Sequence, residues 1–241
     1  MLKITTFGLK EGYILSGRYC VVKKLGKGWE GEVYLVQEKG TKIERSVKIF
    51  FPQRNKGNKN LLFYAKKLHK LKDCDMLIQY HTQEMFVWKG MNIPYLVSEF
   101  VVGEMLSTVL KRQPNHRMRP FQAVHMLYAL VKGVEKIHKQ KEYHGDLHTG
   151  NIMVERYGLT FELKLVDLFH WRESTTPENI QDDICDMIRI FYDAIGGKEW
   201  YAKQPLEVKE IICGLKRSLI LKKFRTSTKL REYLEELNWQ I

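Results

Sequence analysis

The sequence lacks an uninterrupted apolar segment of the length that crosses a bilayer, which is about 20 residues. Its first residues also lack the apolar block of a secretory signal, so we expect a cytoplasmic protein with no membrane partner. Only four cysteines occur, far apart and without a Cys-x-x-Cys pair, which argues against a disulfide framework or a zinc site. No repeat or proline-rich linker divides the 241 residues, and we therefore expect one folded domain.

Acidic residues are in the minority, since 28 Asp and Glu stand against 40 Lys and Arg, which gives a net charge of +12. A positive field of this kind attracts anions such as nucleotides, nucleic acid or acidic protein surfaces. The shortage of acidic residues is concentrated between Lys48 and Lys72, where no Asp or Glu occurs. A solvated helix face is the simplest interpretation of residues 56–72. An acidic partner, or RNA that meets Phe63 and Tyr64, is the alternative.

The first part of the chain has a strand-like pattern. Apolar residues alternate over residues 19–51, which predicts successive antiparallel strands separated by turns. Leucines and alanine at helical spacing predict a helix over residues 59–71, and PYLVSEFVV is typical of another buried strand. The sequence therefore predicts a helix embedded in an antiparallel sheet.

The pattern becomes helical after residues 99–103. A period of roughly 3.6 predicts a long helix that starts at Pro120. A hairpin with its turn at residues 156–159 follows. From Asn179 onward helices dominate, and one of them is expected to run through VKEIICGLKRSLILKKF. A sheet-rich first part followed by a mainly helical part predicts an α+β fold.

A glycine-rich loop and a lysine indicate phosphate binding. Gly26, Gly28 and Gly31 lie in LGKGWEGEVYLV, where glycine would let backbone amides approach phosphate oxygens. A strand follows this loop, whereas a dinucleotide-binding turn opens a helix. Lys48 lies on the next predicted strand, and nucleotide phosphates would supply the anionic partner that its ammonium group needs. A hairpin tip and a solvated lysine that bind nothing are the alternatives.

The segment HGDLHTGN carries the second set of candidates. It contains Asp146 and Asn151, and Asp167 follows at the end of a later strand. Phosphoryl transfer needs a carboxylate near the attacking hydroxyl and oxygen ligands for magnesium ions. Asp and Asn also form ordinary turns, but the order of all these motifs favours phosphoryl transfer.

In these motifs the chain resembles the protein-kinase superfamily, and in particular small bacterial-type Ser/Thr protein kinases, over residues 19–237. The resemblance implies that ATP and Mg²⁺ are bound by a bilobal protein-kinase-like fold. Residues 1–241 would form a single domain. Its N-lobe would be an antiparallel β-sheet with one helix at about residues 12–99, followed by a hinge at 99–103 and a mainly helical C-lobe at 104–241.

The resemblance also implies roles for single residues. Asp146 would orient and deprotonate the acceptor hydroxyl, and Lys48 would pair with the α- and β-phosphates. Asn151 and Asp167 would hold magnesium. Asp183 resembles the acidic residue that supports the catalytic loop from beneath. ATP would be bound by Gly26, Gly28, Gly31, Val33, Lys48, Glu99, Val101 and Met153.

The helix after Lys48 departs from the family pattern, because Tyr64 stands where the family has a Glu that pairs with the lysine. Lys48 therefore needs another partner, and Glu30, Glu32 and Asp167 are the candidates. A nucleotide-binding pseudokinase or scaffold stays an alternative for this reason.

The catalytic loop departs from the pattern as well. His148 stands where Ser/Thr protein kinases carry a Lys, and we include it among the catalytic residues. HGDLHTGN is similar to loops of aminoglycoside, choline and lipopolysaccharide-sugar kinases, which phosphorylate small molecules. The glycine loop and the hinge resemble protein kinases more closely. We therefore expect a Ser/Thr protein kinase, with a small-molecule kinase as the alternative acceptor class.

Overall fold

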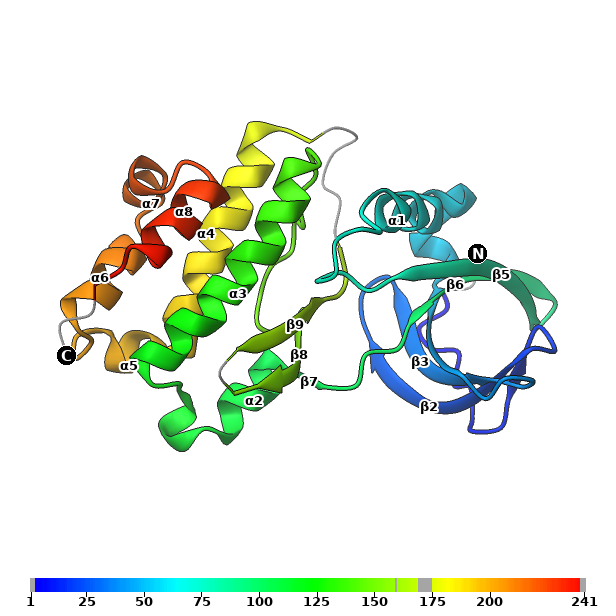
Figure 1. Cartoon of the computed structure of the whole chain (residues 1–241). Coiled ribbons are helices and arrows are strands. Elements are labelled where there is room, and N and C mark those ends of the chain that lie inside the picture. Colours follow the sequence, from blue (N-terminus) through cyan, green and yellow to red (C-terminus); the bar gives the residue numbers. More distant parts are fainter. Residues whose placement is uncertain (1–2, 159, 169–174, 239–241) are drawn as a thin grey trace. The chain divides into compact units, whose positions relative to one another are not determined.

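The chain folds into two compact units. A computed structural model describes residues 3–158, 160–168 and 175–238 (Figure 1). The first unit extends to Asp73 and continues over Leu77–Val101. The second unit comprises Cys74–Met76 and the chain from Val102 onward. Across the described ranges, no helix is both long enough and apolar enough to span a membrane.

An antiparallel sheet forms most of the first unit, and its strands are ordered β1-β2-β3-β4-β6-β5. Their bounds are β1 Ile14–Leu15, β2 Tyr19–Lys27, β3 Gly31–Glu38, β4 Glu44–Phe50, β5 Tyr80–Trp88 and β6 Met91–Glu99. The strands predicted over residues 19–51 are confirmed as β2, β3 and β4. Strand β5 was missing from the prediction, because its polar start, Tyr-His-Thr-Gln-Glu, gave no hydrophobic signal.

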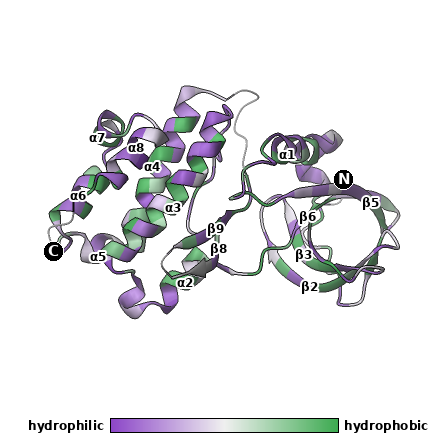
Figure 2. Cartoon of the chain, viewed as in Figure 1, coloured by the Kyte–Doolittle hydropathy of each residue, from purple (hydrophilic) through white to green (hydrophobic). Residues whose placement is uncertain are grey.

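Alternate residues of these strands fill the interior on one side of the sheet. Tyr34, Val47 and Tyr95 are fully buried in this cluster, and Figure 2 shows the hydrophobic colouring of β2, β3 and β6. Ile4 and Phe7, in the segment that precedes β1, belong to the same cluster. The sequence predicts that this lobe starts at about residue 12, and the structure shows that the segment before it also contributes to this core.

Aromatic contacts fix this N-terminal segment in place. The ring of Phe7 stacks on Phe51 with centroids 5.5 Å apart and meets Trp88 edge-on at 5.4 Å. Stacked and edge-to-face pairs of this kind add about 0.5–1.5 kcal/mol each to the free energy gained by burial. The side chain of Gln53 also donates to the carbonyl oxygen of Ile4 at 2.5 Å.

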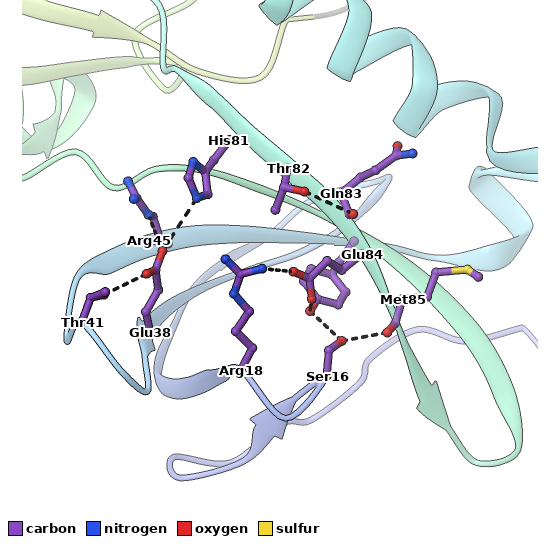
Figure 3. Close-up of polar contacts among 11 residues, drawn as sticks. Ser16, Arg18, Glu38, Thr41, Arg45, His81, Thr82, Gln83, Glu84 and Met85 are labelled. Carbon is purple, nitrogen blue, oxygen red and sulfur yellow. Dashed lines mark hydrogen bonds and ion pairs between the residues drawn. The ribbon is translucent and has the colours of Figure 1, made fainter.

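Polar side chains join the two outer strands of the sheet (Figure 3). After β1, the Ser16 hydroxyl donates to the carbonyl oxygen of Met85 on β5 at 2.7 Å. Arg18 forms an ion pair of 3.0 Å with Glu84, and the Tyr95 hydroxyl donates to the same carboxylate at 2.9 Å. These contacts bring the two edges together and close the sheet around its apolar interior.

Glu32 of β3 is a fully buried carboxylate that ties the N-terminal segment to the strand after the glycine loop. It accepts from the Thr6 hydroxyl at 2.7 Å, the Phe7 N–H at 3.0 Å and the Tyr34 hydroxyl at 2.5 Å. Lys24 Nζ lies 2.5 Å from the same group. Burial alone would raise the pKa of Glu32, but the hydrogen bonds from Lys24, Tyr34 and Thr6 outweigh it and lower the pKa to about 2.

Stability should therefore depend on the ionisation of Glu32. A depressed pKa stabilises the fold above the ordinary value of 4.5, and this stabilisation is lost as the pH falls toward about 2. At neutral pH we expect Glu32→Gln to lower the free energy of unfolding by about 3 kcal/mol. Urea titrations should show the difference from wild type shrinking as the medium is acidified, and a difference independent of pH would contradict the assignment. Exposed Glu11→Gln is the control.

One helix, α1 (Lys59–Lys70), packs on this sheet and confirms the prediction for residues 59–71. Two short turns precede it, η1 (Pro52–Arg54) and η2 (Lys56–Asn58). Its inward face carries Leu61, Tyr64, Lys67 and Leu68, all buried.

The second unit is mainly helical. Its helices are α2 Leu106–Arg112, η3 Pro114–His116, α3 Pro120–Lys139, α4 Pro177–Ala194, α5 Gly197–Tyr201, α6 Leu206–Ile212, η4 Cys213–Leu215, α7 Arg217–Lys223 and α8 Ser227–Glu235. A small sheet has the order β7-β8-β9, with β7 Glu104–Met105, β8 Ile152–Tyr157 and β9 Phe161–Leu165. Helices α3 and α4 lie side by side, and α8 packs on α3 (Figure 1).

Two expectations for this unit are corrected. Strand β8 continues to Tyr157, which pairs with Phe161, so Arg156 and Tyr157 belong to the strand and not to the turn predicted at residues 156–159, of which Leu159 lies outside the described residues. The helix expected through VKEIICGLKRSLILKKF is two helices, α6 and α7. The chain leaves the helical conformation between them, where Cys213 and Gly214 have φ angles of 51° and 59°.

Candidate active site

The glycine loop joins β2 to β3 in the first unit. Gly28 N–H donates to the carbonyl oxygen of Gly31 at 2.9 Å and closes the turn. A Cβ atom at Gly31 would lie 2.0 Å from the carbonyl oxygen of Ile49 on β4, so only glycine fits there. At Gly26 and Gly28, by contrast, nothing lies within 4 Å of a Cβ position. The open space beside these two glycines suits a ligand that approaches the backbone closely.

Lys48 lies in the middle of β4 and contacts two polar groups of this unit. Its Nζ donates to Glu30 Oε2 at 2.8 Å and to the Tyr64 hydroxyl at 3.0 Å. Of the candidates named from the sequence, Glu30 therefore binds Lys48. Glu32 does not serve this role: Val33 pairs with Lys48 in the sheet, so Glu32, one residue away, points to the opposite face. There it is held by Thr6, Tyr34 and Lys24.

Of the residues expected to bind ATP, Glu99 ends β6 and Val101 follows two residues later. Glu99 N–H donates to the carbonyl oxygen of Gln79 at 2.9 Å, and Glu99 Oε2 accepts from Gln79 N–H at 3.1 Å. A contact of the Glu99 backbone with adenine can therefore use only its carbonyl oxygen. Within the described part of the chain, the N–H of Val101 donates to no carbonyl oxygen, so this N–H can donate to a bound nucleotide.

In the second unit, the loop between α3 and β8 holds Asp146 in a defined position. Asn151 Nδ2 donates to Asp146 Oδ2 at 3.0 Å and to the carbonyl oxygen of Asp146 at 2.9 Å. Asn151 is buried, and its own N–H donates to the carbonyl oxygen of His148 at 2.9 Å. The loop thus uses Asn151 to fix both the backbone and the carboxylate of Asp146.

His148 lies beside the same carboxylate. Its Nε2 is 3.7 Å from Asp146 Oδ2, and its Nδ1 accepts from Gly150 N–H at 3.0 Å. The side chain is exposed. Because Nδ1 is an acceptor, the proton of a neutral His148 resides on Nε2, the nitrogen that faces Asp146.

Asp167 lies next to Asn151 through the backbone. Val166 N–H donates to the carbonyl oxygen of Asn151 at 3.0 Å, and Asp167 follows with a φ of 55°. Since Asn151 Nδ2 is held by Asp146, its Oδ1 is left to act as a ligand. A carboxylate and an amide oxygen suit magnesium, which usually keeps several waters and binds substrate phosphates. The side chains in this unit therefore fit the expected metal ion.

Met153, on β8 opposite Met105, is half-buried.

Asp183 of α4 supports this loop from inside the unit. The fully buried carboxylate accepts from the N–H groups of His144 at 2.7 Å and Gly145 at 2.9 Å. His138 Nε2 lies 3.0 Å from Asp183 Oδ2. Burial acts to raise the pKa of Asp183, but the hydrogen bond and the charge of His138 outweigh it and hold the pKa below its ordinary value. Gly145 has a φ of 84°, a conformation that favours glycine at this place.

Sequence reasoning missed two functional neighbours. They are His138 in α3 and Asn60 in α1, which the motifs and the apolar patterns did not single out. His138 Nδ1 lies 3.0 Å from the Ser227 hydroxyl, and Asn60 Nδ2 donates to Glu30 Oε1 at 3.0 Å. Both partners are distant in the sequence, and no local signal points to them.

The expected site residues fall into two sets, each within one unit. The first unit carries Gly26, Gly28, Gly31, Val33, Lys48, Glu99 and Val101, and the second carries Asp146, His148, Asn151, Met153 and Asp167.

Known proteins similar to this chain are kinases. It is 26% identical over 250 residues to a Bacillus subtilis (strain 168) protein described as "Probable serine/threonine-protein kinase YbdM", covering 94% of this chain and 91% of that protein. It is 27% identical to "Calcium-dependent protein kinase 4" of Plasmodium falciparum, covering 59% of this chain but only 26% of that protein.

Solved structures agree with the fold. The kinase domain of Mycobacterium tuberculosis PknI superposes with a TM-score of 0.68 at 16% identity, covering 95% of this chain and 99% of that domain. The predicted α+β, protein-kinase-like fold is thereby confirmed. The family model described as "Protein kinase domain" matches residues 19–202, which is most of the sequence, and the chain therefore belongs to the protein kinase family.

Proposed function

We propose that this protein is an ATP-dependent Ser/Thr protein kinase that transfers the γ-phosphate of Mg-ATP to a hydroxyl group of a protein. Family membership and the Bacillus subtilis relative of similar length support this function. The single observation that carries it is the position of the Asp146 carboxylate, which accepts from Asn151 Nδ2 at 3.0 Å. The backbone of Asn151 in turn binds Val166, the residue before Asp167.

Asp146 would act on the acceptor hydroxyl. One carboxylate oxygen accepts from Asn151 Nδ2, so the other can accept a hydrogen bond from an incoming Ser or Thr hydroxyl. In that position it would orient the nucleophile and take its proton as the oxygen attacks. His148 Nε2, 3.7 Å from Asp146 Oδ2, would help to keep this carboxylate in position.

The remaining residues would bind and orient the nucleotide. Asn151 Oδ1 and the Asp167 carboxylate would hold magnesium, which neutralises the charge of the phosphates when it is bound. Lys48 would pair with phosphate oxygens, and the amides beside Gly26 and Gly28 would approach them closely.

Transfer of labelled phosphate tests this proposal. The purified protein should label a generic protein acceptor when ATP and Mg²⁺ are present, and a chelator should abolish the labelling. Transfer only to sugars or aminoglycosides would instead identify a small-molecule kinase. Nucleotide binding without transfer to any acceptor would identify a pseudokinase and would end the proposal.

The basic segment, residues 56–72, is proposed to contact an acidic protein partner. Lys56, Lys59 and Lys66 are exposed along this segment, and no acidic residue accompanies them. Tyr64 is buried and packs on Phe63 with ring centroids 6.4 Å apart. Tyr64 therefore serves the core of the unit, which removes it as the stacking ring that RNA would need.

Charge reversal tests this surface. With an acidic protein acceptor, we expect the double variant Lys59→Glu, Lys66→Glu to raise KM for that acceptor about threefold to tenfold. The effect is modest because each exposed ion pair contributes little to the binding free energy. Added salt should raise the wild-type KM in the same direction. Lys198→Glu, an exposed reversal in the second unit, is the control. An unchanged KM in the paired variant would rule the surface out.

A further inference from the structure

The ammonium group of Lys48 is mostly buried and needs a fixed negative partner. The side chain is 15% exposed, and the Nζ atom lies 4.1 Å from the ring centroid of Tyr64 and 5.3 Å from that of Phe50. Aromatic faces attract a cation but do not neutralise it. Because α1 offers Tyr64 where the family has a carboxylate, the full negative charge has to come from elsewhere.

Glu30 supplies that charge from the glycine loop. Its Oε2 atom lies 2.8 Å from Lys48 Nζ, and its side chain is only 11% exposed. The backbone of Glu30 is also fixed, since its carbonyl oxygen accepts from Phe51 N–H at 2.8 Å. Lys48 and Glu30 thus form a nearly buried ion pair whose acidic member is held at its backbone by the end of β4.

The second carboxylate oxygen is anchored as well. Asn60, in the first turn of α1, donates from Nδ2 to Glu30 Oε1 at 3.0 Å and to the carbonyl oxygen of Arg54 at 3.0 Å. Both oxygens of Glu30 therefore have a defined partner. A carboxylate with this degree of fixation can hold an ammonium group in one orientation, which a flexible surface glutamate cannot.

We propose that Glu30 is the positioning residue of Lys48. From its place in the glycine loop, it performs the task that a helix carboxylate performs elsewhere in the family. Asn60 positions Glu30, and the Tyr64 hydroxyl completes the set. The glycine loop and Lys48 are thereby coupled, so the loop must be folded for the lysine to be oriented. This inference rests on the proposed kinase function only for its effect on turnover; the pairing itself can be tested without activity.

The test compares Glu30→Gln with wild type and with Glu44→Gln, which replaces an exposed glutamate at the start of β4. Misplacing a group that orients a substrate by about 1 Å can cost roughly 100-fold in rate. We expect kcat to fall about 10-fold to 100-fold in Glu30→Gln, with KM for ATP changed about threefold or less. An unchanged kcat would overturn the proposal, and so would a higher kcat, because Glu30 would then be a blocking group.

A second measurement needs no nucleotide. An ammonium group that loses its carboxylate partner is deprotonated more readily, so its amine reacts faster. Mass spectrometry should show acetylation of Lys48 by an amine-reactive reagent about threefold to tenfold faster in Glu30→Gln than in wild type. Equal rates would overturn the pairing. A wild-type protein that transfers no phosphate would refute the proposed function alone, since the labelling comparison would stand.

Moving the carboxylate to the helix gives the sharpest comparison. The double variant Glu30→Gln, Tyr64→Glu places an acid at the position that the family uses. If the lost charge caused the defect, kcat should recover at least about threefold over Glu30→Gln, and the acetylation of Lys48 should slow again. Thermal melts identify variants that fail to fold. No recovery in a folded double variant would count against the proposal.

Discussion

Replacing Asp146 by Asn is expected to lower kcat about 10²-fold to 10⁴-fold, the range that general acid–base groups contribute. The amide keeps the size of the side chain but cannot accept the proton of the acceptor hydroxyl. Since Asn151 Nδ2 donates to Asp146 Oδ2, an amide oxygen can preserve that contact and the loop should keep its shape. KM for ATP should therefore change little while turnover collapses.

Labelled-phosphate transfer measures turnover, and calorimetry with a non-hydrolysable ATP analogue measures nucleotide binding. The matched control is Asp73→Asn, an exposed carboxylate of the first unit. Equal loss in both variants would show that the assay reports on charge or stability rather than on the acceptor site. Retention of more than about a tenth of the wild-type kcat in Asp146→Asn would contradict the role of this residue as base.

Replacing Asp183 by Asn should strongly destabilise the second unit. The carboxylate is fully buried, accepts from two backbone N–H groups and lies 3.0 Å from His138 Nε2. Breaking a buried pair by removing one charged partner costs about 3–5 kcal/mol. An amide also presents an NH₂ group where both carboxylate oxygens now accept, so one N–H of the catalytic loop loses its partner.

Chemical denaturation measures this loss, and Asp193→Asn, an exposed carboxylate on the same helix, is the control. Because the pKa of Asp183 is held low, its contribution is present above its ordinary value of 3.8 and declines as the pH falls below it. The difference between wild type and variant should therefore narrow in acid. A loss below about 1 kcal/mol at neutral pH would show that His138 and the loop amides do not depend on this charge.

Local sequence patterns predicted much of this fold. Periodic apolar residues located β2, β3, β4, α1 and α3, because these elements bury one regular face. They missed β5, whose polar residues join the sheet edges through Ser16 and Glu84 rather than through an apolar stripe. They also missed the break between α6 and α7, where the left-handed conformation of Cys213 has no signature in the residue type.

The candidate site divides in the same way. Motif spacing singled out Asp146, Asn151 and Asp167 as candidates, since each lies on a loop or at a strand end whose chemistry is local. The partner of Lys48 could only be narrowed to three acids, because a choice among them depends on which face of β3 each side chain occupies and on the fold of the loop tip. The structure places Glu32 on the face opposite Lys48 and brings Glu30 into contact with it.

The way in which Phe7 and Thr6 reach β3 has a practical consequence for anyone who trims or tags this protein. A version starting near residue 12 would keep every motif of the family yet lose the ring that stacks on Phe51 and the two donors to Glu32. Glu32 follows Gly31 directly, so weak activity in a trimmed version would reflect a misplaced glycine loop. Affinity tags therefore belong at the carboxyl end.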